Sequence, residues 1–130
     1  MKDYYKEIYD FTHPRLIDVG DEDLQPLLLT SDVLITDYSS AEMDFSLTKR
    51  PVFQLCNDRV DYDRGFYINP EDLPFPYAEN DEQLIENIIS FNTERYLQEL
   101  DYFNEARIGL AETGLASRTV MDWIKQHCSN

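Results

Sequence analysis

Residues 31–53 read SDVLITDYSSAEMDFSLTKRPVF, and this segment contains the main sequence evidence for the fold class. Residues 33–35 form an unbroken apolar run, which is typical of a strand covered on both faces of a parallel sheet. The run ends at an Asp-Tyr pair, and two serines then precede a segment with helical spacing. Because serine is a preferred residue at the start of a helix, we expect a helix over residues 41–48, with Met43 and Leu47 facing the sheet.

The alternation of strands and helices continues on both sides of this stretch. Residues 16–19 and 52–55 are short apolar runs, and each is expected to form a strand. The acids at residues 21–23 lie where the helix dipole favours negative charge, so a helix is expected between the first two strands. A further short helix is expected over residues 4–11. Such alternation predicts an α/β fold. We expect a single partial domain over residues 1–130, a three-layer Rossmann-like parallel sheet with flanking helices.

The second half of the chain is predicted to be a long loop followed by helices. The loop covers residues 57–80, and loops of that length are often functional. Helical spacing then begins at Asp81 and again at Thr93, and we expect these two residues to cap their helices. The last helix is expected over residues 116–126. Its apolar side chains are expected to pack inward, and they are Val120, Trp123 and Ile124.

Composition excludes several classes of protein. The chain has 130 residues, with 11 Lys plus Arg against 26 Asp plus Glu, and a net charge of −15. That balance argues against nucleic-acid binding and against a basic membrane-surface patch. No stretch approaches the roughly 18–20 apolar residues of a membrane-spanning helix, and the polar N-terminal residues lead us to expect a cytoplasmic protein. Cys56 and Cys128 are expected to be free thiols.

Ser39 and Ser40 are the first candidate site residues. They follow a predicted strand, at the edge where open parallel sheets bind ligands. They also open a helix, whose first amides and dipole favour anions. Their hydroxyls add donors without bulk, so the pair is suited to a phosphate or diphosphate. The simpler alternative is that one serine only caps the helix, and the two roles are compatible.

Asp44 and Arg64 are the other candidates. Asp44 lies one turn past Ser40 on the same helix face, where its carboxylate would accept hydrogen bonds from sugar or polyol hydroxyls. The alternative is a solvated helix acid. Arg64 lies in the long loop and would bridge phosphate oxygens, or else it neutralises nearby acids. Neither His13 nor His127 has a nucleophile placed near it by spacing, and we expect no metal and no cofactor.

Several segments together resemble one known family. Residues 31–53 resemble the hallmark segment of the CDP-glycerol glycerophosphotransferases, bacterial enzymes that build teichoic acids and related glycerol-phosphate polymers. Residues 63–76, DRGFYINPEDLPFP, are similar to a loop of that family, with Phe75 where the family usually has glycine. Residues 114–124, GLASRTVMDWI, are similar to its closing helix. The resemblance covers about residues 15–126.

The resemblance implies both a fold and a reaction. The fold is the C-terminal domain portion of a GT-B glycosyltransferase, and the reaction transfers glycerol phosphate from CDP-glycerol, or a similar CDP-alcohol, to a teichoic-acid-type polymer. Ser39, Ser40 and Asp44 match positions that contact the donor, and Arg64 matches a loop arginine. The family's catalytic histidines have no match here. We therefore expect the chain to be inactive alone, and to work with a domain or polypeptide that supplies them. Members of the family act at the inner face of the cell membrane.

Two other functions fit parts of the same pattern. The VLITDY segment also resembles a strand end of receiver-like signalling domains, with Asp37 as the phosphate acceptor. Against this, the acids at residues 21–23 are too close to Asp37 to be the magnesium-binding pair of that fold, and the lysine it requires has no candidate. A non-catalytic binding or assembly module with the same fold is the third interpretation.

Overall fold

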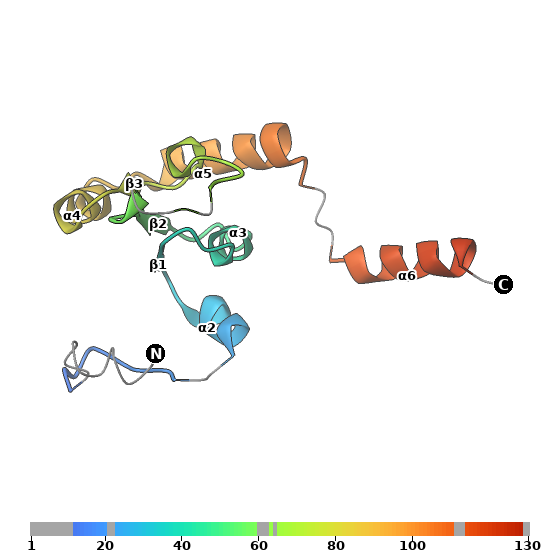
Figure 1. Cartoon of the computed structure of the whole chain (residues 1–130), viewed down its shortest axis with the longest axis horizontal. Coiled ribbons are helices and arrows are strands. Elements are labelled where there is room, and N and C mark those ends of the chain that lie inside the picture. Colours follow the sequence, from blue (N-terminus) through green and yellow to red (C-terminus); the bar gives the residue numbers. More distant parts are fainter. Residues whose placement is uncertain (1–11, 21–22, 60–62, 64, 111–113, 129–130) are drawn as a thin grey trace. The chain divides into compact units, whose positions relative to one another are not determined.

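The computed structural model (Figure 1) describes residues 12–20, 23–59, 63, 65–110 and 114–128. The chain divides into two compact units, Met1–Ser31 and Asp32–Asn130. The helix predicted over residues 4–11 lies outside the described residues, and the expectation of a single domain stays a prediction.

The first unit holds a helix, α2 (Leu24–Thr30), in the place where the sequence predicts one. The strand predicted over residues 16–19 is wrong. The backbone there forms a local turn, in which the Leu16 amide donates a hydrogen bond to the His13 carbonyl at 2.9 Å. Ile17 is 79% exposed. An apolar run becomes a strand only where a neighbour pairs with its backbone, and the described residues of this unit offer none.

The second unit is built on an open sheet of three parallel strands, β1 (Leu34–Thr36), β2 (Val52–Leu55) and β3 (Tyr77–Ala78), in the order β1-β2-β3. This confirms the α/β class and two of the predicted strands. The third strand, β3, lies in the segment predicted to be a loop. It follows Pro76 directly and is too short to give a periodic signal. The Gln54 amide donates to the Pro76 carbonyl, and the Cys56 amide donates to the Ala78 carbonyl, at 2.9 and 2.8 Å.

Helices alternate with the strands and then follow them: α3 (Ala41–Ser46), α4 (Asp81–Ile89), α5 (Thr93–Phe103) and α6 (Ala116–His127), with short helical turns η2 (Pro70–Asp72) and η3 (Asn104–Ile108). The predicted caps of α4 and α5 are each off by one residue. The side chains of Asn80 and Asn92 accept the first-turn hydrogen bonds, so Asp81 and Thr93 are the first residues inside these helices.

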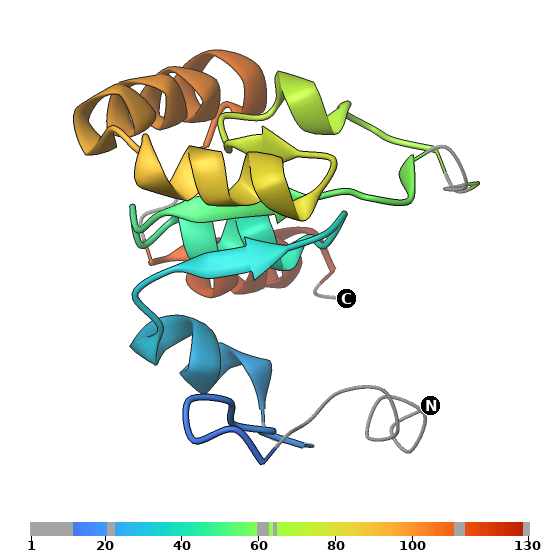
Figure 2. The ribbon, with the colours of Figure 1, turned by 90° about the vertical axis from the view of Figure 1, so that its left-hand side faces the viewer.

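Strand β2 sends alternate side chains to opposite faces of the sheet. Gln54 faces α3, where it hydrogen-bonds to Glu42. Phe53 faces the other side, where its ring lies 5.2 Å from the ring of Phe91, between α4 and α5. Figure 2 shows α4 in front of the sheet and α3 behind it. The sheet therefore carries helices on both faces, as predicted.

The core lies around Phe45, Val52 and Leu100, whose exposed fractions are all 0%. Strand β1 is less covered than its apolar run predicts, because Ile35 is 50% exposed. Ile35 pairs with Phe53 and so shares the face of the sheet that α4 covers. Since α4 packs against β2 and β3, this face of β1 stays open.

Helix α6 ends one residue beyond its predicted bound, but the predicted inward packing of its apolar side chains is wrong. Val120 and Trp123 are 56% and 57% exposed, and Ile124 is 41% exposed. No residue of α6 is buried. The helical spacing therefore predicted the helix correctly. Among the described residues, however, no apolar surface packs against the apolar face of α6. Within those residues no helix is both long and apolar enough to cross a bilayer.

The two cysteines are free thiols, as predicted. Cys56 is buried directly after β2, whereas Cys128 is exposed after α6. Burial raises the pKa of the Cys56 thiol, so this group behaves as a small apolar residue of the core.

The core assignment predicts a contrast between two apolar side chains. Leu100→Ala should lower the free energy of unfolding by about 2–5 kcal/mol, because it leaves a cavity in a fully packed site. Ile89→Ala is the control, since Ile89 is 81% exposed, and it should change stability by less than about 0.5 kcal/mol. Urea denaturation followed by circular dichroism measures both. Equal losses would show that α5 does not close the core.

Candidate functional site

The candidate site begins where β1 ends and the chain turns sharply into α3. Tyr38 lies in this turn with φ of 40°, a left-handed conformation that is uncommon for a residue other than glycine and that concentrates at functional sites. Its ring lies 5.3 Å from the ring of Phe66 in the long loop. Burial raises the pKa of the Tyr38 hydroxyl, and the nearby Cys56 and Asp58 raise it further. The turn therefore packs against the loop through the contact between Tyr38 and Phe66.

The two serines have different roles. The Ser39 hydroxyl accepts a hydrogen bond from the Ala41 amide at 3.3 Å, and the Ser39 carbonyl accepts one from the Glu42 amide at 3.1 Å. Ser39 therefore caps the start of α3, as the simpler sequence alternative holds. Ser40 makes no capping hydrogen bond with its side chain, and it is exposed. Of the two serines, Ser40 is therefore the one whose side chain is exposed and takes no part in capping the helix.

Asp44 lies where the sequence places it relative to Ser40. The Asp44 amide points back to the Ser40 carbonyl at 3.5 Å, so the two residues are neighbours along one stripe of α3. The Asp44 side chain is exposed. Arg64 lies outside the described residues.

A cavity of about 430 Å³ lies beside Ser40. Its walls come from the start of α3, from β2 and from the loop that contains Gly65 and Phe66. The cavity therefore brings together residues 36–40 (the TDYSS turn) and residues 65–67 (the GFY loop), which belong to two of the segments that carry the family resemblance. The residues that line it are Tyr38, Ser40, Glu42, Met43, Gln54, Gly65, Phe66, Tyr67, Ile68, Pro70 and Leu73.

Glu42 and Gln54 are two cavity residues that the sequence analysis missed. Glu42 is 6% exposed and Gln54 is 0% exposed. The Gln54 Nε2 donates a hydrogen bond to Glu42 Oε2 at 2.9 Å. Burial raises the pKa of the Glu42 carboxyl, and the hydrogen bond from Gln54 partly offsets that rise. The opposite oxygen of the amide, Gln54 Oε1, is buried without a hydrogen-bond partner.

A signal for Glu42 was present in the sequence. Helix α3 buries Glu42, Phe45 and Ser46, whereas the prediction placed Met43 and Leu47 against the sheet. Leu47 is 49% exposed, so the predicted face is wrong by about one residue. Phenylalanine is the largest apolar side chain of the segment, and counting back three positions from Phe45 gives the sheet-facing stripe directly.

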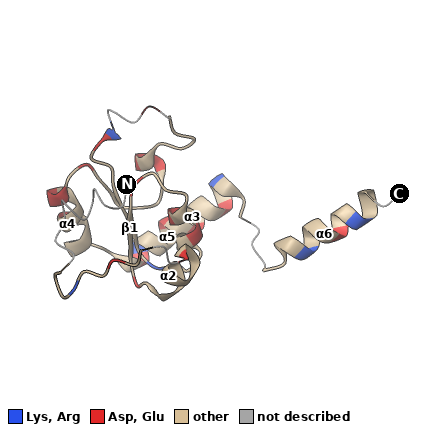
Figure 3. Ribbon diagram, turned by 60° about the horizontal axis from the view of Figure 1, so that its bottom comes forward, with Lys and Arg blue, Asp and Glu red and all other residues tan. Residues whose placement is uncertain are grey.

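Acidic residues lie in the turn and in the helix that form the site. Asp37, Glu42 and Asp44 all lie within the turn or the start of α3. Figure 3 shows further acidic positions on α4 and α5. An anionic ligand therefore meets a repulsive field at long range, and local hydrogen-bond donors have to overcome it.

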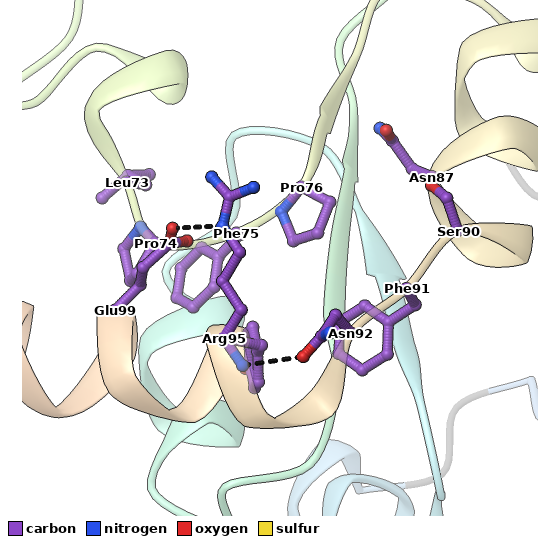
Figure 4. A pocket seen from close by; sticks show the side chains of 11 residues that line it. Leu73, Pro74, Phe75, Pro76, Asn87, Ser90, Phe91, Asn92, Arg95 and Glu99 are labelled. Carbon is purple, nitrogen blue, oxygen red and sulfur yellow. Dashed lines mark hydrogen bonds and ion pairs between the residues drawn. The ribbon is translucent and has the colours of Figure 1, made fainter.

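A second hollow of about 280 Å³ lies between the segment around Phe75 and the junction of α4 with α5 (Figure 4). Its polar side chains are engaged with one another or with the backbone. Arg95 forms an ion pair with Glu99 at 2.7 Å, and the Asn92 side chain accepts from the Arg95 amide at 2.9 Å. Phe75, the residue that departs from the family pattern, is 4% exposed there. We regard this hollow as the outer surface of the core.

Comparison with known proteins assigns a family. Residues 3–126 match the family described as CDP-Glycerol:Poly(glycerophosphate) glycerophosphotransferase. The chain belongs to this family. The match includes both motif segments that line the cavity, and it favours the glycerophosphotransferase interpretation over the receiver-like alternative with Asp37 as the acceptor.

Individual relatives act on teichoic acids, according to their names. The chain is 37% identical over 115 residues to the teichoic acid poly(glycerol phosphate) polymerase of Staphylococcus epidermidis, which covers 83% of this chain and 16% of that protein. It is 33% identical over 128 residues to the teichoic acid glycerol-phosphate transferase of Staphylococcus aureus, covering 94% of this chain and 30% of that protein. A teichoic acid ribitol-phosphate primase of Bacillus spizizenii is 36% identical over 104 residues, covering 78% and 26%.

The chain thus spans less than a third of the length of these curated relatives. No solved structure matches it.

The burial of Glu42 predicts a dependence of stability on pH. A carboxyl whose pKa is raised by folding stabilises the protein below its ordinary pKa of about 4.3, and this contribution is lost as the pH rises through the raised value. Glu42→Gln removes that loss, so the variant should gain stability relative to the parent protein as the pH rises from about 4 to 7. Thermal melts at several pH values measure this gain.

Asp44→Asn is the matched control, because it removes an exposed acid from the same helix. Its effect should stay below about 0.5 kcal/mol. A Glu42→Gln difference that does not change with pH would contradict the burial of an ionisable group at this position.

Proposed function

We propose that this chain is the donor-binding part of a glycerophosphotransferase that moves glycerol phosphate from CDP-glycerol to a hydroxyl of a teichoic-acid-type polymer. The observation that carries this proposal is the cavity beside Ser40, whose walls combine the TDYSS turn with the GFY loop. The names of the family and of its relatives supply the class of substrate. In this proposal the sheet belongs to the C-terminal domain of a GT-B fold.

The proposed roles follow from the different positions of the side chains. The exposed Ser40 hydroxyl donates a hydrogen bond to an oxygen of the diphosphate. Ser39 caps α3 and thereby holds the turn that presents Ser40. Asp44, one turn further along, accepts a hydrogen bond from a glycerol hydroxyl, since a carboxylate is a poor neighbour for phosphate. Arg64, which precedes Gly65 in the long loop, pairs with a phosphate oxygen.

In the proposed reaction, a hydroxyl oxygen of the polymer attacks the β-phosphorus of CDP-glycerol. A new phosphorus–oxygen bond forms to the acceptor, the bond to CMP breaks, and the CMP leaves with the electron pair. Negative charge builds on the diphosphate oxygens, where donors such as Ser40 stabilise it. The attacking hydroxyl must lose a proton to a base, and the residues that line the cavity include no histidine.

We propose that this base lies in another part of a longer protein or in a partner polypeptide. The chain by itself would then bind the donor without turning it over. Its site of action would be the cytoplasmic face of the membrane.

The affinity expected of the chain alone is weak. The net charge of −15 opposes an anion, but physiological salt screens charges beyond about 8 Å. Each hydrogen bond to a charged group contributes roughly 1.5–3 kcal/mol, and association itself opposes binding by several kcal/mol. A few such contacts, without a pocket for the cytidine base, correspond to dissociation constants of about 1 mM.

The test is an NMR titration of the chain with inorganic diphosphate and with CDP-glycerol. Amide shifts should move in residues 39–42, and Ser40→Ala should weaken binding of both ligands by about tenfold, the loss of one charged hydrogen bond. The double variant Ser39→Ala, Ser40→Ala should bind no better. Asp44→Asn should weaken CDP-glycerol binding and leave diphosphate binding nearly unchanged.

Ser90→Ala is the matched control, because the exposed Ser90 hydroxyl donates to the Glu86 carbonyl at the end of α4. It should leave both affinities intact. Unchanged binding in Ser40→Ala would reduce the serine pair to a helix cap, and the site assignment would then fail.

A further inference from the structure

The Gln54 side chain has one half of its amide engaged, and the other half is buried without a hydrogen-bond partner. Gln54 is wholly buried, with an exposed fraction of 0%, and it lines the cavity beside Ser40. Its Nε2 donates to Glu42 Oε2 at 2.9 Å, whereas its Oε1 has no partner. A buried amide oxygen without a hydrogen bond is costly, and native proteins seldom keep one without a ligand or water to satisfy it.

Glu42 fixes which half of the amide is open. Its carboxylate accepts from the amide nitrogen and so orients Gln54, leaving the Oε1 acceptor for something else. Glu42 also lines the cavity, and its second oxygen is a further acceptor. The two buried polar side chains of the cavity therefore offer acceptors, and a matching ligand has to bring donors.

Apart from Ser40 and the tyrosine hydroxyls, the rest of the cavity wall is apolar. Met43, Phe66 and Leu73 contribute to it, and such surfaces pack against the carbon–hydrogen faces of a ligand. The volume of about 430 Å³ lies within the range of about 300–1,000 Å³ that is typical of small-molecule sites. Hydroxyl groups on a short carbon chain combine donors with apolar faces, and this chemistry suits the cavity better than a bare anion does.

We propose that Gln54 and Glu42 form a subsite for the hydroxyl groups of a polyol, with Gln54 Oε1 accepting a hydrogen bond from one of them. The subsite rests on the proposed function, because Ser40 at the same cavity would bind the phosphate to which the polyol is attached. Gln54 and Glu42 then determine specificity. Ser40 binds the phosphate, and the two buried side chains bind the polyol attached to it.

The experiment compares glycerol 3-phosphate with inorganic phosphate in NMR titrations of the whole chain. The parent protein should bind glycerol 3-phosphate about three- to tenfold more tightly, the contribution of one to two neutral hydrogen bonds. Gln54→Leu, which approximately keeps the volume but removes the acceptor, should lower this ratio by about the contribution of one neutral hydrogen bond and leave phosphate affinity unchanged. Gln54→Met serves the same purpose if the leucine variant does not fold, and Gln98→Leu, at an exposed position of α5, is the control.

Two further readouts separate the subsite from the serine site. Glycerol or ribitol alone should shift the side-chain amide signal of Gln54, even in Ser40→Ala. Phosphoethanolamine, which carries an ammonium in place of hydroxyls, should bind no more tightly than phosphate.

The outcomes distinguish the two proposals. If phosphate binds near Ser40 but glycerol 3-phosphate gains nothing, or keeps its gain in Gln54→Leu, the polyol subsite is refuted and the serine site stands. Tighter binding of phosphoethanolamine than of glycerol 3-phosphate also refutes it, in favour of a cation site. If no phosphate ligand binds at Ser40 while polyols still move the Gln54 amide, the proposed function fails and the subsite remains.

Discussion

The parallel pairing of β1 with β2 is the constraint on which the second unit depends. Leu34 pairs with Val52, and Thr36 pairs with Gln54, so the last residue of β1 lies beside the buried amide of β2. The chain must then leave β1, turn at Tyr38 and return along α3 over the same face. One strand pairing therefore brings the serine turn and the buried polar pair to a single cavity. A shift of register by one residue would send Gln54 to the opposite face and separate them.

Helices and strands that depend on a local sequence pattern were predictable, whereas those that depend on a distant partner were not. The strands at residues 33–35 and 52–55, the helix after Ser40 and the long C-terminal helix all carry local periodic signals, and each was predicted. Residues 16–19 carry the same apolar signal without forming a strand, because strand formation depends on a distant neighbour that a local pattern does not report. The two-residue β3 shows the reverse case: pairing with β2 creates a strand where composition suggested a loop.

In the candidate site, too, residues with a local signal were predicted and residues that depend on a distant contact were missed. Ser39, Ser40 and Asp44 were selected because serine and aspartate have recognisable chemistry at a strand end and on a helix face. Glu42 and Gln54 were missed because their significance lies in a contact across 12 positions of sequence. A glutamate in a helix is usually solvated, and the sequence prediction placed Met43 and Leu47, rather than the stripe of Glu42 and Phe45, against the sheet. The family resemblance supplied the substrate class, which neither periodicity nor charge contains.

The different structural roles of Ser39 and Ser40 have an evolutionary consequence. Ser39 holds the start of α3 with a side-chain oxygen that accepts from a backbone amide, and threonine, asparagine or aspartate provides the same acceptor. Selection on the fold alone would therefore tolerate drift among these residues at position 39. Position 40 makes no such contact, so folding places little restriction on it. A paralogue that has lost its ligand would keep a capping residue at position 39 and vary freely at position 40, and adjacent sites in one motif would diverge at different rates.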